Sequence, residues 1–183
     1  MANGVIVESR IQATNIDALN RTAKAAVDVA GGGLVALTAS GAQGNEVWTA
    51  AAPAAGSLGG LWIAYNPSEH LTKVGGKFFA GLSEDPRDYV NIAGRPFDCF
   101  KPAVGDEIDI TVDCVDATAS SVVAGDILES KDGQTTFTRV AANTGATAGS
   151  TAFKVEYVGT VPFPAGSIGM EQVKMFRCVC VQA

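Results

Sequence analysis

The sequence predicts a mainly β protein, built as a small antiparallel barrel or sandwich of short strands. Three observations support this prediction. The 183 residues include 21 glycines and 7 prolines, which divide the chain into short segments. Many of these segments are short apolar runs or alternate apolar with polar residues, as β-strands do. Helical spacing of three and four residues is nearly confined to one segment close to the start.

The length favours one domain with an additional arm. We expect residues 1–30 to form an N-terminal arm with a short helix or strand, and residues 31–183 to form the mainly β domain. Within the β domain, residues 73–102 carry turn signals around a few apolar residues and predict a long ordered excursion.

The N-terminal region starts with the apolar run 5–7, which predicts a short strand. A short helix is predicted after it, because apolar residues recur at helical spacing up to Gly31, which would end the helix. These residues are Ile16, Leu19, Ala23, Ala26 and Val27, with Thr14 or Asn15 as the N-cap. Residues 25–30 also alternate, so a strand at the end of this segment is the alternative.

The remaining elements are predicted as short strands separated by turns. The expected strands are 34–38, 46–50, 61–65, 107–114, 122–123, 135–140, 152–158 and 172–181. The strand at 107–114 alternates most clearly: Ile108, Ile110, Val112 and Cys114 share one face, and Glu107, Asp109, Thr111 and Asp113 share the other. We therefore expect a half-buried strand with a solvated acidic face.

Charge and composition exclude several classes of function. There are 13 Lys and Arg residues against 19 Asp and Glu, a net charge of −6, which argues against nucleic acid as the main partner. No window is apolar enough for a membrane span or a secretory signal, so we expect neither. Only 17% of residues are charged, and the apolar ones are mostly small. Such a surface suits a protein that packs against neighbouring proteins.

No residue pattern predicts an enzyme, a cofactor or a metal site. The one histidine, His70, lies in a predicted turn without a nucleophile motif. Cys178 and Cys180 share a strand face and are expected to pack in the core, and all four cysteines are expected to be reduced. Acidic residues at 126–132 lack the spacing of a calcium loop, and adventitious calcium binding there is left open. An enzyme with a carboxylate-based site is the least favoured reading.

The order of turns and strands resembles that of capsid decoration proteins of tailed bacteriophages, also called cement or auxiliary head proteins. The resemblance covers roughly residues 4–158 and rests on the phrases NGVIVES, VDVAGGGLVALT, NEVWTAAAP, LWIAYNP, YVNIAGRPFDCFKPAVGDEIDIT, AGDILES and FKVEYVGT. It implies a structural role without catalytic residues. Such a protein is made in the host cytoplasm, binds the outer surface of the capsid in the virion, and bridges subunits of the major capsid protein.

We expect a homo-oligomer, a trimer or similar, that contacts the capsid through the N-terminal arm, the Ala- and Gly-rich link 51–60 and a pair of phenylalanines. The candidate interface residues are Val5, Ile6, Val7, Pro53, Leu58, Phe78 and Phe79. Trp48 and Trp62 are expected to pack in the core instead. The alternative function is a receptor- or glycan-binding module of a phage fibre or tail.

Overall fold

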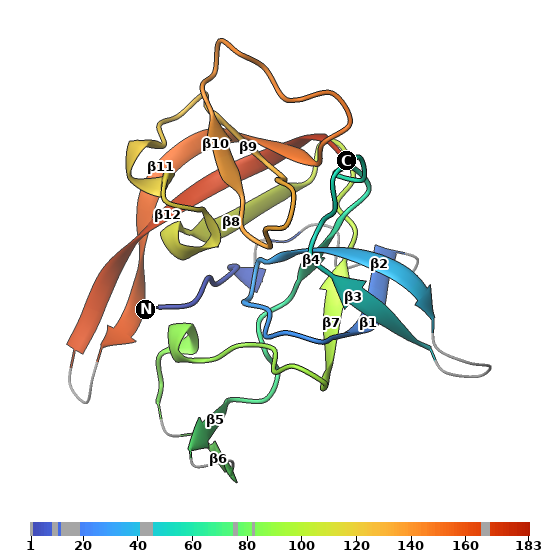
Figure 1. Ribbon diagram of the computed structural model, residues 1–183. Coiled ribbons are helices and arrows are strands. Elements are labelled where there is room, and N and C mark those ends of the chain that lie inside the picture. The colour runs from blue at the N-terminus through green and yellow to red at the C-terminus, as the bar shows by residue number, and fades with distance from the viewer. Residues whose placement is uncertain are drawn as a thin grey trace.

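The computed structural model describes residues 2–8, 11, 19–40, 46–74, 77–81, 83–165 and 169–183. The chain is mainly β, as predicted, and contains a closed barrel, a five-stranded sheet and a separate two-stranded hairpin. Figure 1 shows the five-stranded sheet above the barrel, and the hairpin projecting at the bottom of the view. Where the chain is described, its helical segments are short 3-10 turns.

The barrel has the strand order β1-β3-β2-β4-β7 and closes by pairing β7 with β1. Its strands are β1 (Asn20–Ala25), β2 (Leu34–Ser40), β3 (Val47–Ala51), β4 (Trp62–Ala64) and β7 (Pro96–Phe100). All pairings are antiparallel except that of β1 with β3, which is parallel. The segment 73–102 thus contributes one barrel strand, β7.

The five-stranded sheet has the order β10-β9-β11-β12-β8 and is antiparallel throughout. Its strands are β8 (Glu107–Thr111), β9 (Ile127–Glu129), β10 (Thr138–Val140), β11 (Ala152–Ala165) and β12 (Gly169–Gln182). The predicted strand at 122–123 is wrong, because these two residues lie in the turn after the 3-10 helix η6 (Ala119–Ser121). The remaining elements are β5 (Leu71–Val74), β6 (Lys77–Ala80), and the 3-10 helices η4 (Pro86–Asp88) and η5 (Val112–Cys114).

Two clusters of buried side chains hold the fold together. The larger lies between the barrel and the sheet and joins Leu34, Ile63 and Phe100 of the barrel to Phe153 and Phe176 of the sheet. The smaller fills the barrel and consists mostly of small side chains, which are Ala23, Ala25, Ala50, Ala64, Val29, Val35 and Cys99, together with Phe97. A five-stranded barrel leaves little internal space, which accounts for the alanines there.

The predicted N-terminal helix is wrong where the chain is described, because residues 20–25 form β1. Ala23 and Ala25 point into the barrel while Lys24 between them is exposed, which is the alternation of a strand. Pairing with β3 and β7 on either side decides the conformation. Ile16 and its predicted caps lie outside the described residues.

The solvated acidic face predicted for 107–114 is wrong at Asp109 and Thr111, whereas Glu107 is exposed as predicted. The strand ends at Thr111, and Asp109 is only 1% exposed. The β8–β12 register places Arg177 opposite Asp109, and the guanidinium donates to both carboxylate oxygens at 3.0 and 3.2 Å. Burial of the charge is therefore compensated by an ion pair.

Candidate functional site

The hairpin β5–β6 presents two adjacent aromatic side chains to solvent. Every residue of β6 is exposed, and Phe78 and Phe79 each keep 43% of their surface accessible. In the described residues, the hairpin pairs with no third strand. Two strands alone are marginally stable in water, so contacts at its base must help to hold it.

Two contacts fix the base of the hairpin. The Arg95 guanidinium lies 5.7 Å from the centre of the Phe78 ring and forms an ion pair with Glu69 at 2.7 Å. The His70 ring stacks on Tyr89, with ring centres 4.5 Å apart and planes 7° apart. Consistent with the prediction, His70 is exposed and lies in a turn.

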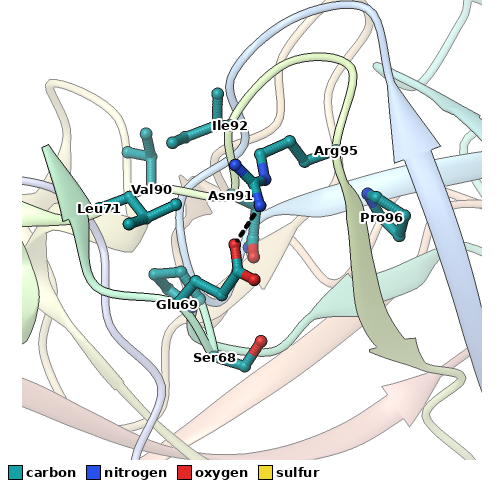
Figure 2. A pocket seen from close by; sticks show the side chains of 9 residues that line it. Ser68, Glu69, Leu71, Val90, Asn91, Ile92, Arg95 and Pro96 are labelled. Carbon is teal, nitrogen blue, oxygen red and sulfur yellow. Dashed lines mark ion pairs between the residues drawn. The ribbon is translucent and has the colours of Figure 1, made fainter. Parts of the chain in front are cut away.

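Beside this base is an open pocket of about 200 Å³ (Figure 2). Its apolar wall is made of Pro67, Leu71, Val90, Ile92 and Pro96, and its polar groups come from Ser68, Glu69, Asn91 and Arg95. Figure 2 shows the Glu69–Arg95 ion pair spanning one side of the pocket. The pocket is suited to receive one side chain or a sugar ring of a partner.

The predicted interface residues of the arm lie inside the protein. Val5 is 4% exposed and packs with Phe163 and Val173, while Ile6 is 1% exposed and belongs to the larger core cluster. Val7 is half-buried and its N–H donates to the Asp109 carbonyl at 2.8 Å. Val5 and Ile6 are therefore corrected from partner contacts to intramolecular ones: their apolarity serves the edge of β8.

The link 51–60 also contacts the chain's own sheet. The buried Pro53 accepts a hydrogen bond through its carbonyl from Gly133 N at 2.8 Å. The half-buried Leu58 accepts through its carbonyl from Thr151 N at 2.8 Å and from Ser130 Oγ at 2.7 Å. The link ties barrel to sheet, so Pro53 is unsuited to a partner contact and Leu58 offers only part of its side chain.

The other residues that the sequence singled out are structural. Trp48 and Trp62 are partly buried against the barrel interior. All four cysteines are buried, which confirms the prediction for Cys178 and Cys180. Burial raises the pKa of the Cys99 and Cys114 thiols to about 12, and that of Cys180 to about 11. These thiols therefore stay protonated and unreactive at neutral pH.

The acidic residues at 126–132 do not converge on a common point. Asp126 is buried and accepts from Arg139 Nε at 2.5 Å. Glu129 accepts from Thr147 N at 2.7 Å and so fastens the loop 141–151. Across the residues that the structure describes, no three His, Cys, Asp or Glu side chains are grouped to hold a metal ion. No helix of the described chain is both long and apolar enough to cross a membrane.

One surface feature was not identified from the sequence: the outer half of the long β11–β12 ribbon, which extends beyond β8 in Figure 1. It is held by Arg87, which forms ion pairs with Asp85 at 2.6 Å and Glu171 at 2.5 Å and lies over the Phe163 ring. The alternation of 157–165 extends the predicted strand 152–158 and was the available signal.

Comparison of the chain with protein families, with curated proteins and with solved structures gives no match.

Proposed function

We propose that this protein is a non-enzymatic virion component that binds the outer surface of a tailed-phage capsid as a homo-oligomer and stabilises it by bridging subunits of the major capsid protein. The observation that carries the proposal is the β5–β6 hairpin. It presents two adjacent phenylalanines to solvent beside an open pocket. Exposed aromatic groups next to a recess are typical of the few residues that supply most of the binding energy of an interface.

The energetics favour the hairpin over the other predicted contacts. Full burial of a phenylalanine side chain contributes about 1.5–3 kcal/mol, and about half of that surface is already covered in the free chain. The two side chains project from opposite faces of β6, because successive residues of a strand do so. A partner that encloses the hairpin from both sides would bury both rings.

The sequence supports the same reading. The order of turns and strands resembles that of capsid decoration proteins over most of the chain. The weakly charged surface suits close packing against other subunits. A specific interface needs about 800 Å² per partner, so the hairpin is expected to be the centre of a larger contact.

The test is co-sedimentation with expanded capsids that lack the protein. We expect wild type to bind and to raise the temperature at which the shells disrupt. Phe79→Ser is expected to weaken binding at least about tenfold, the equivalent of about 1.4 kcal/mol. Val104→Ser removes another exposed apolar side chain far along the chain and serves as the matched control. Undiminished binding by the Phe78→Ser/Phe79→Ser variant, or no gain in shell stability, would contradict the proposal.

The pocket in Figure 2 supports a second candidate, a receptor- or glycan-binding module of a fibre or tail. It combines an apolar wall with the hydroxyl of Ser68 and the charged groups of Glu69 and Arg95, a combination that sugars can use. A glycan array would separate the candidates. Specific signals that disappear in Arg95→Ala would favour this function, and a blank array together with capsid binding would remove it.

A further inference from the structure

Residues 3–7 lie in a groove that three separate parts of the chain build around them. One side is the edge of β8, another is Asn66 just after β4, and the third is η4. In Figure 1 the dark-blue segment runs between the five-stranded sheet and the barrel. The groove holds this segment in an extended conformation, as a strand-binding site would.

On the sheet side, the main chain of the segment pairs with the free edge of β8. Val7 N donates to the Asp109 carbonyl at 2.8 Å, and Thr111 N donates to the Val5 carbonyl at 3.0 Å. Val5 N donates to Thr111 Oγ1, also at 3.0 Å. The edge of β8 is thereby covered, which removes a site where strands of other chains would pair.

On the barrel side, one amide side chain takes the place of a neighbouring strand. Ile6 N donates to Asn66 Oδ1 at 3.0 Å, and Asn66 Nδ2 donates to the Ile6 carbonyl at 2.7 Å. The backbone of Asn66 donates in turn to Glu8 Oε1 at 2.9 Å. Further along, Asn3 donates through N and Nδ2 to the Arg87 carbonyl. The two peptide groups that flank Ile6 are therefore each hydrogen-bonded to β8 on one side and to Asn66 on the other.

The groove also selects side chains. A Cβ at Gly4 would lie 2.8 Å from the Cys114 sulfur and 3.0 Å from the Gly31 carbonyl oxygen, so only glycine fits without displacement of a buried group. Val5 enters the small cluster with Phe163, and Ile6 enters the main core. The site thus recognises an extended Asn-Gly-Val-Ile segment.

We propose that this groove also accepts residues 3–7 of a second copy of the chain, so that exchanged arms link neighbouring copies. The second copy is the occupant that brings the required glycine, valine and isoleucine together with the asparagine for the Arg87 carbonyl. Exchange replaces each contact by the same contact, so its main cost is the entropy of association. A high concentration of the chain reduces that cost by mass action. The inference does not depend on binding to a capsid.

The test uses two variants, each with one added cysteine. Ile6 and Ile110 are opposite each other in an antiparallel bridge. The flanking bonds from Val7 N and Thr111 N make them a close, non-hydrogen-bonded pair, the spacing that suits a disulfide. Ile6→Cys and Ile110→Cys proteins are mixed, oxidised and separated on a non-reducing gel. Cys114 lies close to Ile110, so both proteins also carry Cys114→Ser; the other three native cysteines are buried.

We expect a covalent dimer in the mixture and none in either variant alone, because only an exchanged arm joins position 6 of one chain to position 110 of another. The Ile6→Cys/Ile110→Cys double variant is the positive control for the geometry. If it crosslinks within one chain while the concentrated mixture gives no dimer, exchange does not occur and the proposal is overturned.

A second measurement decides the question if the cysteine variants do not fold. A labelled peptide of sequence ANGVIVE, residues 2–8, is added to the wild-type chain and its binding is measured by fluorescence anisotropy. The control peptide has alanine in place of Gly4. We expect binding of the first peptide and at least about tenfold weaker binding of the second, from the steric conflict with Cys114. Equal binding of both peptides, or none by the first, would refute the proposal.

Discussion

The hairpins β5–β6 and β11–β12 share a simple antiparallel topology and differ in what surrounds them. β11 and β12 have 14 residues each, and their inner halves are flanked by β9 and β8. β5 and β6 have four residues each and, within the described chain, no flanking strand. As a result, Phe153 and Phe176 of the long hairpin are fully buried, while Phe78 and Phe79 remain exposed.

The difference shows that neighbouring strands, more than local sequence, determine whether an aromatic strand residue is buried here. The segments KFFA and KMFRC have similar strand propensity. Only the second lies between two strands that pack on the larger core. The phenylalanines of KFFA keep part of their surface accessible to water or to another molecule.

The largest expected effect is on the long hairpin. Phe176→Ala removes a fully buried ring from the core and is expected to lower the free energy of unfolding by about 3–5 kcal/mol. Phe79→Ala, the matched change in the short hairpin, is expected to cost less than about 1 kcal/mol. Urea denaturation measures both. Similar losses for the two variants would mean that the exposed ring is buried in solution.

The next effect concerns the anchor of the ribbon's outer half. Arg87→Met leaves the side chain volume but removes the ion pairs to Asp85 and Glu171. We expect the free energy of unfolding to fall by about 2 kcal/mol. This is less than the usual cost of breaking a fully buried ion pair, because Glu171 is more than half exposed. Hydrogen exchange should accelerate at residues 161–164 and 169–173 and stay unchanged in β5–β6. A Glu171→Gln variant, which keeps the Asp85 pair, is the control and should lose less.

Acid should weaken the edge of the five-stranded sheet at β10, where Asp126 binds Arg139. At Asp126, burial raises the pKa, but the hydrogen bonds from Arg139, Val123 N and Ala142 N together hold it below its ordinary value of 3.8. Because the folded pKa is lowered, the stabilisation is present above about pH 4 and is lost as the pH falls through the folded pKa.

Urea denaturation at about pH 7 and about pH 3 tests this. We expect wild type to lose stability on acidification, and Asp126→Asn to be less stable at neutral pH with a smaller acid loss. The pKa of Asp113 is shifted in the opposite direction, because burial raises it and Arg87 offsets only part of this effect. The contribution of Asp113 to the free energy of unfolding is therefore present at low pH and is lost as the pH rises. An acid loss of the same size in Asp126→Asn would contradict the assignment.

The smallest effect is the local opening of the short hairpin. Amides of β5–β6 are expected to exchange with a free energy of opening close to zero, whereas those of β12 exchange only on global unfolding. The thiols of Cys178 and Cys180 offer an independent probe, because both are buried on β12. They should react with a thiol reagent at the rate of global unfolding. Fast labelling of these thiols in native protein would show that the long hairpin opens separately.

The β class and many of the strands could be predicted from the sequence because their alternation is local. β8 and β12 are examples. β5 and β6 were not predicted, because residues 73–102 showed only turn signals around a few apolar residues. The helix predicted around 16–27 failed because alanine side chains at 23, 25 and 26 fit both helical and strand spacing. The deciding partners, β3 and β7, come later in the chain.

The errors at the candidate site have the same origin. The burial of Asp109 depends on Arg177 being placed opposite it, and that register involves residues far apart in the sequence. Apolar residues in the arm and the link were read as contacts with another protein. Val5, Ile6 and Pro53 instead meet parts of their own chain, which only the three-dimensional arrangement reveals. The use of the exposed hairpin by a capsid stays a prediction.

The parallel pairing of β1 with β3 has a consequence for the order of folding. β1 cannot be joined to β3 by a tight turn, and Thr22 of β1 also pairs with Asp98 of β7. The ring of strands therefore closes only after a large loop has been ordered, which is slow. The pairing of β11 with β12, by contrast, is local in sequence. We therefore expect this ribbon to form early in refolding, before the barrel closes.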